Sequence, residues 1–174
     1  SEHRTVDSKR NVVVNVHVEA ANINDMTPMP EILDEVERRL GKLPRYMGLD
    51  AGYHNAWIAH LLETKGIQGV IGYRRHTHKG AHYGKYRFRY DPVRDEYICP
   101  EKQRLTWKTT TREGYRQYCC EGKTCKGCPR RVECFGASMS RKVVERHVWQ
   151  DALERVDAFT KTHRGKRIYG WRKE

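Results

Sequence analysis

The stretch "RYMGLDAGYHNAW", residues 45–57, decides the fold. Met47 and Leu49 belong to a short apolar run that indicates a buried strand, and a lone acid, Asp50, follows at once. The two small residues after it allow the chain to turn sharply. In an open α/β sheet, functional side chains gather where strands end at their carboxyl side. The stretch therefore predicts such a sheet, with Asp50 at its functional edge.

The sequence on both sides of this stretch alternates between strand and helix patterns. Apolar residues recur at every second position in the expected strands and on one face of each expected helix. Gly41 and Gly66 stand where the two helices should stop. The expected elements are strands at 11–20, 43–50 and 67–73 and helices at 28–41 and 55–66. Residues 3–11 can form a partner strand for the first of these strands, with a turn at residues 7–10. This order predicts parallel pairing with right-handed crossovers and an α/β fold.

The composition and periodicity of the sequence change after residue 73 and again after residue 140, which suggests three segments. Residues 1–73 form the expected α/β core. Residues 74–140 are basic, aromatic and cysteine-rich, with short strand patterns, and we interpret them as a mainly β insertion. In residues 141–174 helical periodicity returns, with Val144, Val148 and Leu153 on one stripe, so this part is expected to return to the core.

Charge is distributed unevenly along the chain. Basic and acidic residues number 8 and 10 in residues 1–73, 16 and 7 in 74–140, and 10 and 5 in 141–174. The excess of +12 therefore lies in the second half, which favours a polyanion partner such as nucleic acid over a merely solvated basic surface. No apolar run approaches the ~20 residues that span a bilayer, and no secretory leader is evident. We expect a cytoplasmic protein with no membrane partner.

Asp50 has two possible roles on this evidence. A carboxylate at a strand end suits Mg²⁺, which is usually held by one or two carboxylates together with substrate phosphates. Aspartate also caps the turn or helix that follows it. The spacing of residues alone leaves both roles open.

A wider pattern resembles bacterial insertion-sequence transposases with a DDE catalytic domain. The blocks that carry the resemblance occur in the family's order from about residue 3 to residue 174: "VHVEAANINDMTPMPEILDEV", "YMGLDAGY", "GVIGYRR", "YICPEKQRLTW", "RHVWQDALE" and "RIYGWRKE". The resemblance implies an RNase H-like mixed sheet flanked by helices. It also implies two divalent metal ions, Mg²⁺ or Mn²⁺, held by three acids for phosphodiester cleavage and strand transfer.

The same resemblance implies that Asp50 is the second of the three acids. The first would lie upstream of residue 1, since Asp7 falls in a turn and Asp25 in a loop. The third would follow Glu174, or be Glu174 in a shifted register. We therefore expect a fragment that is inactive by itself. In the family, the active protein is an oligomer on transposon ends and target DNA, in the bacterial cytoplasm with the nucleoid. The alternative is a non-catalytic, zinc-stabilised transposase remnant that binds DNA.

All six cysteines lie between residues 99 and 134. Two of them, Cys125 and Cys128, form a C-x₂-C pair, which suits one edge of a tetrahedral Zn²⁺ site. With Cys99 and Cys134 they make the expected structural set of four. Cys119 or Cys120 can take the place of Cys99, and an iron–sulfur cluster or free thiols are the remaining alternatives.

Two basic patches are candidates for DNA contact. Basic side chains neutralise phosphates, and neighbouring aromatic rings can stack on exposed bases. The tyrosines and phenylalanine interleaved with the first patch could instead form the core of the insertion. The first patch is Arg74, Arg75, Lys79, Lys85, Arg87 and Arg89, and the second is Lys166, Arg167, Arg172 and Lys173.

Overall fold

The computed structural model describes residues 1–73, 80, 82–136 and 139–172. The chain divides into two compact units. Unit 1 comprises Ser1–Arg75 and Trp149–Glu174, and unit 2 comprises His76–Val148. Unit 1 is mixed α/β and unit 2 is mainly β, and the chain as a whole has the expected mixed α/β class.

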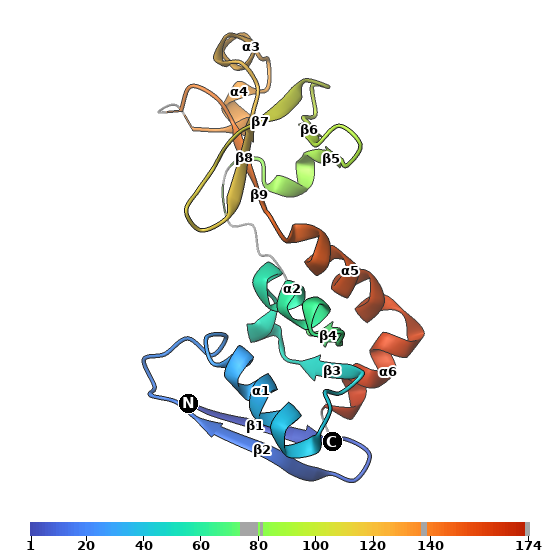
Figure 1. The fold of residues 1–174 in the computed structure, drawn as a ribbon. Helices are drawn as coiled ribbons and strands as arrows, with labels where there is room; N and C mark the ends of the chain where they lie inside the picture. The colour runs from blue at the N-terminus through green and yellow to red at the C-terminus, as the bar shows by residue number, and fades with distance from the viewer. Residues whose placement is uncertain (74–79, 81, 137–138, 173–174) are drawn as a thin grey trace. The chain divides into compact units, whose positions relative to one another are not determined.

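Unit 1 contains two separate two-stranded sheets. Its elements in chain order are β1 (Glu2–Asp7), β2 (Val12–Val18), α1 (Met29–Leu40), β3 (Tyr46–Leu49), the 3₁₀ turn η1 (Ala51–Tyr53), α2 (Ala56–Thr64), β4 (Gln68–Ile71), α5 (Gln150–Lys161) and α6 (His163–Trp171). Strands β1 and β2 form an antiparallel hairpin, and β3 pairs in parallel with β4. Figure 1 shows α1 beside the hairpin and α5 and α6 beside β3 and β4.

The expectation of parallel pairing through all three strands holds only for the last two. Strand β2 pairs with β1 and with no other described strand. A hairpin needs only the short turn after Asp7, whereas a parallel pair needs a crossover, which α2 supplies between β3 and β4.

The core of unit 1 lies between α2, α5 and the β3–β4 pair. Ile58 and Leu62 of α2, Ile71 of β4 and Val156 of α5 are buried together in it. Gly69 of β4 allows this packing, because a Cβ there would lie only 2.8 Å from Cδ1 of Leu62. The apolar periodicity of residues 55–66 thus predicted the buried face of α2 correctly.

Unit 2 is built on a five-stranded antiparallel sheet. Its elements are η2 (Lys85–Arg87), β5 (Arg89–Asp91), β6 (Glu96–Ile98), β7 (Arg104–Thr110), β8 (Tyr115–Cys119), α3 (Gly122–Lys126), α4 (Arg131–Cys134) and β9 (Val143–His147). The strands follow one another in sheet order from β5 to β9. Tyr97, Leu105, Tyr118 and Val144 are buried in the core of this unit.

The expected helix after residue 141 begins only at Gln150. Residues 143–147 form β9 instead, whose residues pair with β8 from Cys119↔Val143 to Tyr115↔His147. Val144 and Arg146 are buried, so the burial alternates as in a strand. Unit 2 therefore extends to Val148, eight residues beyond the expected end of the insertion at residue 140.

Candidate functional site

Asp50 lies directly after β3, at the carboxyl end of the β3–β4 pair. Its backbone is extended, and its Oδ1 accepts a hydrogen bond of 2.8 Å from the backbone N–H of Gly52 at the start of η1. The side chain is exposed, and within the described residues it forms no ion pair with a lysine or arginine. The capping role expected as one alternative is therefore present, and it occupies only one of the two carboxylate oxygens.

Two carboxylates, those of Asp25 and Asp50, lie near Tyr53. Burial raises the pKa of Tyr53 to about 12, and the charges of Asp25 and Asp50 add to this effect. Oη of Tyr53 forms a hydrogen bond of 2.7 Å with Nδ1 of His3, whose Nε2 lies 4.0 Å from Asp25 Oδ1.

The carboxyl end of the β3–β4 pair is also approached by α6. A Cβ on Gly72 would overlap the hydroxyl of Tyr169, and a Cβ on Gly48 would lie 3.7 Å from Cβ of Arg172. Arg172 donates a hydrogen bond of 3.2 Å to Tyr169 Oη. Arg172, a member of the second basic patch, therefore lies beside Gly48 of β3, two residues before Asp50.

Two other members of that patch, Lys166 and Arg167, are exposed on α6, and Lys173 lies outside the described residues. Lys166 and Arg167 lie within α6, whereas Arg172 follows its last residue. Arg167 lies over the ring of Trp171, with Cζ 5.8 Å from the ring centroid.

Sequence reasoning missed a part-buried pair that links the turn after Asp50 to α5. Nε2 of His54 lies 2.8 Å from Oδ1 of Asp157 on α5, and the His54 side chain is only 6% exposed. This contact fixes the end of η1 against α5. The two residues are 103 positions apart, so no local sequence pattern could reveal the pair.

The first basic patch is only partly within the described residues. Arg74, Arg75 and Lys79 lie outside them. Lys85 and Arg87 are on η2 and Arg89 begins β5, and all three are exposed.

The aromatic residues of this segment divide between core and surface. Phe88 is buried and Tyr90 packs against the core of unit 2, as the core alternative predicted. Tyr86 is 72% exposed, contrary to that alternative. Cζ of Arg87 lies 5.7 Å from the Tyr86 ring centroid, so a basic and an aromatic group meet at the surface.

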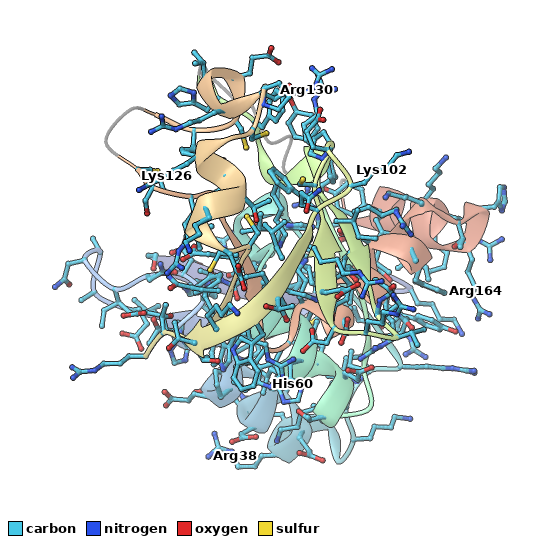
Figure 2. All side chains as sticks on the ribbon, turned by 90° about the horizontal axis from the view of Figure 1, so that it is seen from above. Arg38, His60, Lys102, Lys126, Arg130 and Arg164 are labelled. Atoms are coloured by element: carbon cyan, nitrogen blue, oxygen red, sulfur yellow. The ribbon has the colours of Figure 1, made fainter. Side chains whose placement is uncertain are left out.

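Other basic groups of unit 2 reach outward from its turns and short helices. Figure 2 labels three of them, Lys102, Lys126 and Arg130. All three are exposed, but Arg130 forms an ion pair of 2.7 Å with Glu101. Unit 2 carries 17 basic and 8 acidic residues, and unit 1 carries 17 and 14, so the excess charge lies mainly in unit 2.

Five cysteines line a single small cavity of about 30 Å³ in unit 2. The lining cysteines are Cys99, Cys120, Cys125, Cys128 and Cys134. The set of four expected from the sequence is therefore gathered together with Cys120, while Cys119 is buried elsewhere. Sγ of Cys120 lies 2.9 Å from Sγ of Cys125.

The cysteine cavity has the donor chemistry of a soft metal site. Burial raises the pKa of Cys120 to about 12, with Cys125 and Cys99 contributing, and burial raises the pKa of Cys134 to about 11. Such thiols are neutral without a metal, and a bound Zn²⁺ would hold them as thiolates. In the described part of the chain, however, no three of these sulfur atoms lie within 4.8 Å of one another. Binding would therefore require the loops around α3 and α4 to draw together.

Residues 98–174 match the family model described as a transposase DDE domain. The match covers 77 of the 174 residues, from β6 of unit 2 through α5 and α6 of unit 1, and does not include Asp50. Searches of curated proteins and of solved structures gave no match. The family match supports a DDE transposase, and hence an enzyme family of the polynucleotidyl-transferase type that acts on DNA. No helix among the described residues is long and apolar enough to cross a membrane.

Proposed function

We propose that this chain is part of a bacterial insertion-sequence transposase that cleaves and joins DNA with Mg²⁺ or Mn²⁺. The observation that carries the proposal is the match of residues 98–174 to the transposase DDE domain. The strand–turn–helix arrangement around Asp50 supports it from the other half of the chain, where the same family resemblance predicted a catalytic acid. An RNase H-like arrangement and an oligomeric complex on DNA in the bacterial cytoplasm belong to this proposal.

Asp50 is the proposed metal-binding acid. Its carboxylate is exposed, is held at the carboxyl end of a parallel strand, and forms no ion pair with a lysine or arginine among the described residues. The divalent ions would activate a nucleophile and stabilise the leaving oxygen. Among the described residues, Asp50 has no two further metal-ligating side chains gathered with it. The proposal therefore places the other two acids outside the described residues, and Glu174 is the one acid of this sequence among them.

The test of this role is DNA nicking by the chain extended with its natural flanking sequence. We expect Mn²⁺-dependent nicking of DNA carrying the transposon ends, and its loss by at least a hundredfold in the Asp50→Asn variant. Asp7→Asn is the matched control, because Asp7 also caps a turn through a backbone N–H, that of Lys9, but in the β1–β2 hairpin. Nicking that survives in Asp50→Asn, or that is lost equally in both variants, would refute the assignment.

DNA binding is proposed to use the exposed basic residues of unit 2 near η2. Each phosphate contact contributes a slope of about −0.9 to the dependence of log affinity on log salt concentration. Replacing Lys85, Arg87 and Arg89 by alanine should reduce the slope by up to about 3 and weaken binding to all sequences alike. Arg94→Ala, an exposed basic residue in the turn between β5 and β6, is the control. An unchanged salt slope in the triple variant would place the DNA elsewhere.

A second candidate function is a zinc-stabilised DNA-binding remnant that does not cut. The gathering of five cysteines around one cavity favours it, because a site with four thiolates leaves no position for substrate and serves folding instead. The two candidates share the fold and differ in catalytic competence, because only the first cleaves DNA. DNA binding without nicking, in the extended chain supplied with Mn²⁺, would select the second.

A further inference from the structure

The β1–β2 hairpin exposes its apolar face and buries its polar one. In β2, the residues turned toward α1 are Asn15, which is fully buried, and His17, which is 9% exposed. Val16 and Val18 on the other face are 43% and 73% exposed. Burying polar groups is costly unless they are bonded. Strand β2 buries Asn15 and His17 and leaves Val16 and Val18 exposed. This arrangement indicates that the two buried polar side chains have a ligand or partner on that face.

The partners on α1 are two glutamates on one face of the helix. Glu31 and Glu35 are four residues apart, so their side chains project from the same side. One ligand atom of each, together with one ring nitrogen of His17, lies within 4.8 Å of the other two. In the described residues this is the one group of three His, Cys, Asp or Glu side chains with ligand atoms so close together.

The distance between His17 and Glu35 fits a shared metal ion better than a direct bond. Nδ1 of His17 lies 3.4 Å from Oε1 of Glu35, whereas a charge-assisted hydrogen bond is about 2.7–2.9 Å. Two ligand atoms bound tetrahedrally to Zn²⁺ at about 2.1 Å are about 3.4 Å apart. The exposed Glu31 can complete the set by turning its side chain.

The outer contacts of this cluster are those of a metal site. A metal-bound histidine usually donates its second ring N–H to a carboxylate, and a bound carboxylate is itself hydrogen-bonded. Nε2 of His17 lies 3.1 Å from Oε1 of Glu19, and Nδ2 of Asn15 donates a bond of 2.7 Å to Oε2 of Glu35. The remaining polar atom of the buried Asn15 side chain, Oδ1, has no hydrogen-bond partner among the described residues.

We propose that His17 Nδ1, Glu31 and Glu35 bind a divalent first-row transition metal ion such as Zn²⁺, whose ligands include imidazole nitrogen and carboxylate oxygen. Water completes the coordination. The ion fastens α1 to the β1–β2 hairpin and so has a structural role. Its ligands are nitrogen and oxygen, and the site is distinct from Asp50 and from the cysteine cavity.

The test is a Zn²⁺ titration of the full chain, followed by long-range ¹H–¹⁵N NMR signals of the histidine rings. These signals separate the site from the cysteine cavity, because only this site contains a histidine ligand. We expect the Nδ1 signal of His17 to shift on binding. Total zinc at saturation should fall by one ion per chain in Glu35→Gln. In Glu31→Gln, which removes an exposed ligand without disturbing the buried contacts, the affinity should fall at least tenfold.

Glu37→Gln is the matched control, since Glu37 is exposed on the same helix but outside the cluster. It should bind zinc as the parent chain does. The native amide spectrum of unit 1 establishes that each variant is folded. If Glu35→Gln does not fold, Glu31→Gln still tests the proposal. Unmoved His17 signals at saturating Zn²⁺, or equal affinity and stoichiometry at this site in the parent and Glu31→Gln chains, would overturn the proposal.

Discussion

If the cysteine cavity binds zinc as proposed, its affinity must rise steeply with pH. The lining thiols are buried and close to one another, and this raises the pKa of Cys120 to about 12 and of Cys134 to about 11. Near neutral pH, each thiol that becomes a ligand must therefore lose its proton to solvent. Each proton released increases the apparent affinity tenfold for every pH unit, as long as the pH is below the pKa of the free thiol.

The number of thiolates sets the size of this effect. Four thiolate ligands predict an increase of up to about ten-thousandfold between pH 6 and pH 7, and three predict about a thousandfold. A site of nitrogen and oxygen ligands with one histidine gives at most about tenfold over the same interval. The slope therefore distinguishes the cysteine cavity from the site on α1 without any structural measurement.

The assay is competition for Zn²⁺ against a chelator at pH 6.0, 6.5 and 7.0, in the Glu35→Gln background so that only the cysteine site is counted. Calorimetry in two buffers with different ionisation heats gives the protons released per zinc, expected to be three to four. Cys128→Ser should abolish tight binding. Cys119→Ala is the control, because Cys119 does not line the cavity. Fewer than two protons per zinc, or a Cys128→Ser chain that binds like its parent, would refute the thiolate site.

Three further predictions concern stability, each measured by amide hydrogen exchange within its own unit, because two units need not unfold together. Asp95 accepts hydrogen bonds of 2.7 and 2.6 Å from the hydroxyls of Tyr90 and Tyr118. Burial acts to raise the pKa of Asp95, but these hydrogen bonds outweigh the effect of burial, so the pKa is lowered. Asp95→Asn should therefore destabilise unit 2 by about 2 kcal/mol above pH 4, and less as the pH falls through the lowered pKa; equal losses at pH 7 and pH 2 would contradict this. Leu62→Ala, in the core of unit 1, should cost about 3 kcal/mol in the exchange of α2 and β4 amides, and a loss under 1 kcal/mol would mean that the core collapses around the gap. Asn55→Ala removes the cap bond of 2.7 Å to the backbone N–H of Trp57 and should cost about 1 kcal/mol; unchanged exchange in the first turn of α2 would show that the cap is dispensable.

The elements closest to the opening stretch could be predicted because their signals are local. The helices at Met29–Leu40 and Ala56–Thr64 have an apolar stripe, and each is followed by a glycine with positive φ, Gly41 at 69° and Gly66 at 70°. Such a conformation favours glycine, so the residue and the helix end coincide. The capping of the turn after Asp50 was equally local, since acceptor and donor are two residues apart.

The predictions that failed concerned features that depend on residues far away in the sequence. Val144 and Val148 fit a helical stripe as well as they fit a strand, and only the pairing of β9 with β8 decides between the two. Period two in β2 showed that the strand has two faces but not which one is buried. That choice depends on Glu35 of α1, which lies 20 residues from Asn15.

The cysteines show how far a local pattern extends. The pair Cys125 and Cys128 was identified by spacing alone, and the structure brings it beside Cys99 and Cys134. Cys119 and Cys120 could not be distinguished in sequence. Cys119 is the last residue of β8, and side chains of neighbouring residues in an extended chain point to opposite sides, so only one of the two can reach the cavity. That one is Cys120.

The exposed valines of β2 and the proposed metal site on α1 have one physical origin. A two-stranded hairpin is at best marginally stable in water, so β1 and β2 need contacts with the rest of unit 1. Because the valine face is exposed, the side-chain contacts that join the hairpin to other described elements involve polar groups. Asn15 and His17 lie against Glu35, and His3 lies against Tyr53. Polar contacts of this kind contribute little net free energy each. A metal ion that joins β2 to α1 would add what the apolar face does not supply, and this is the physical reason to expect it at that place.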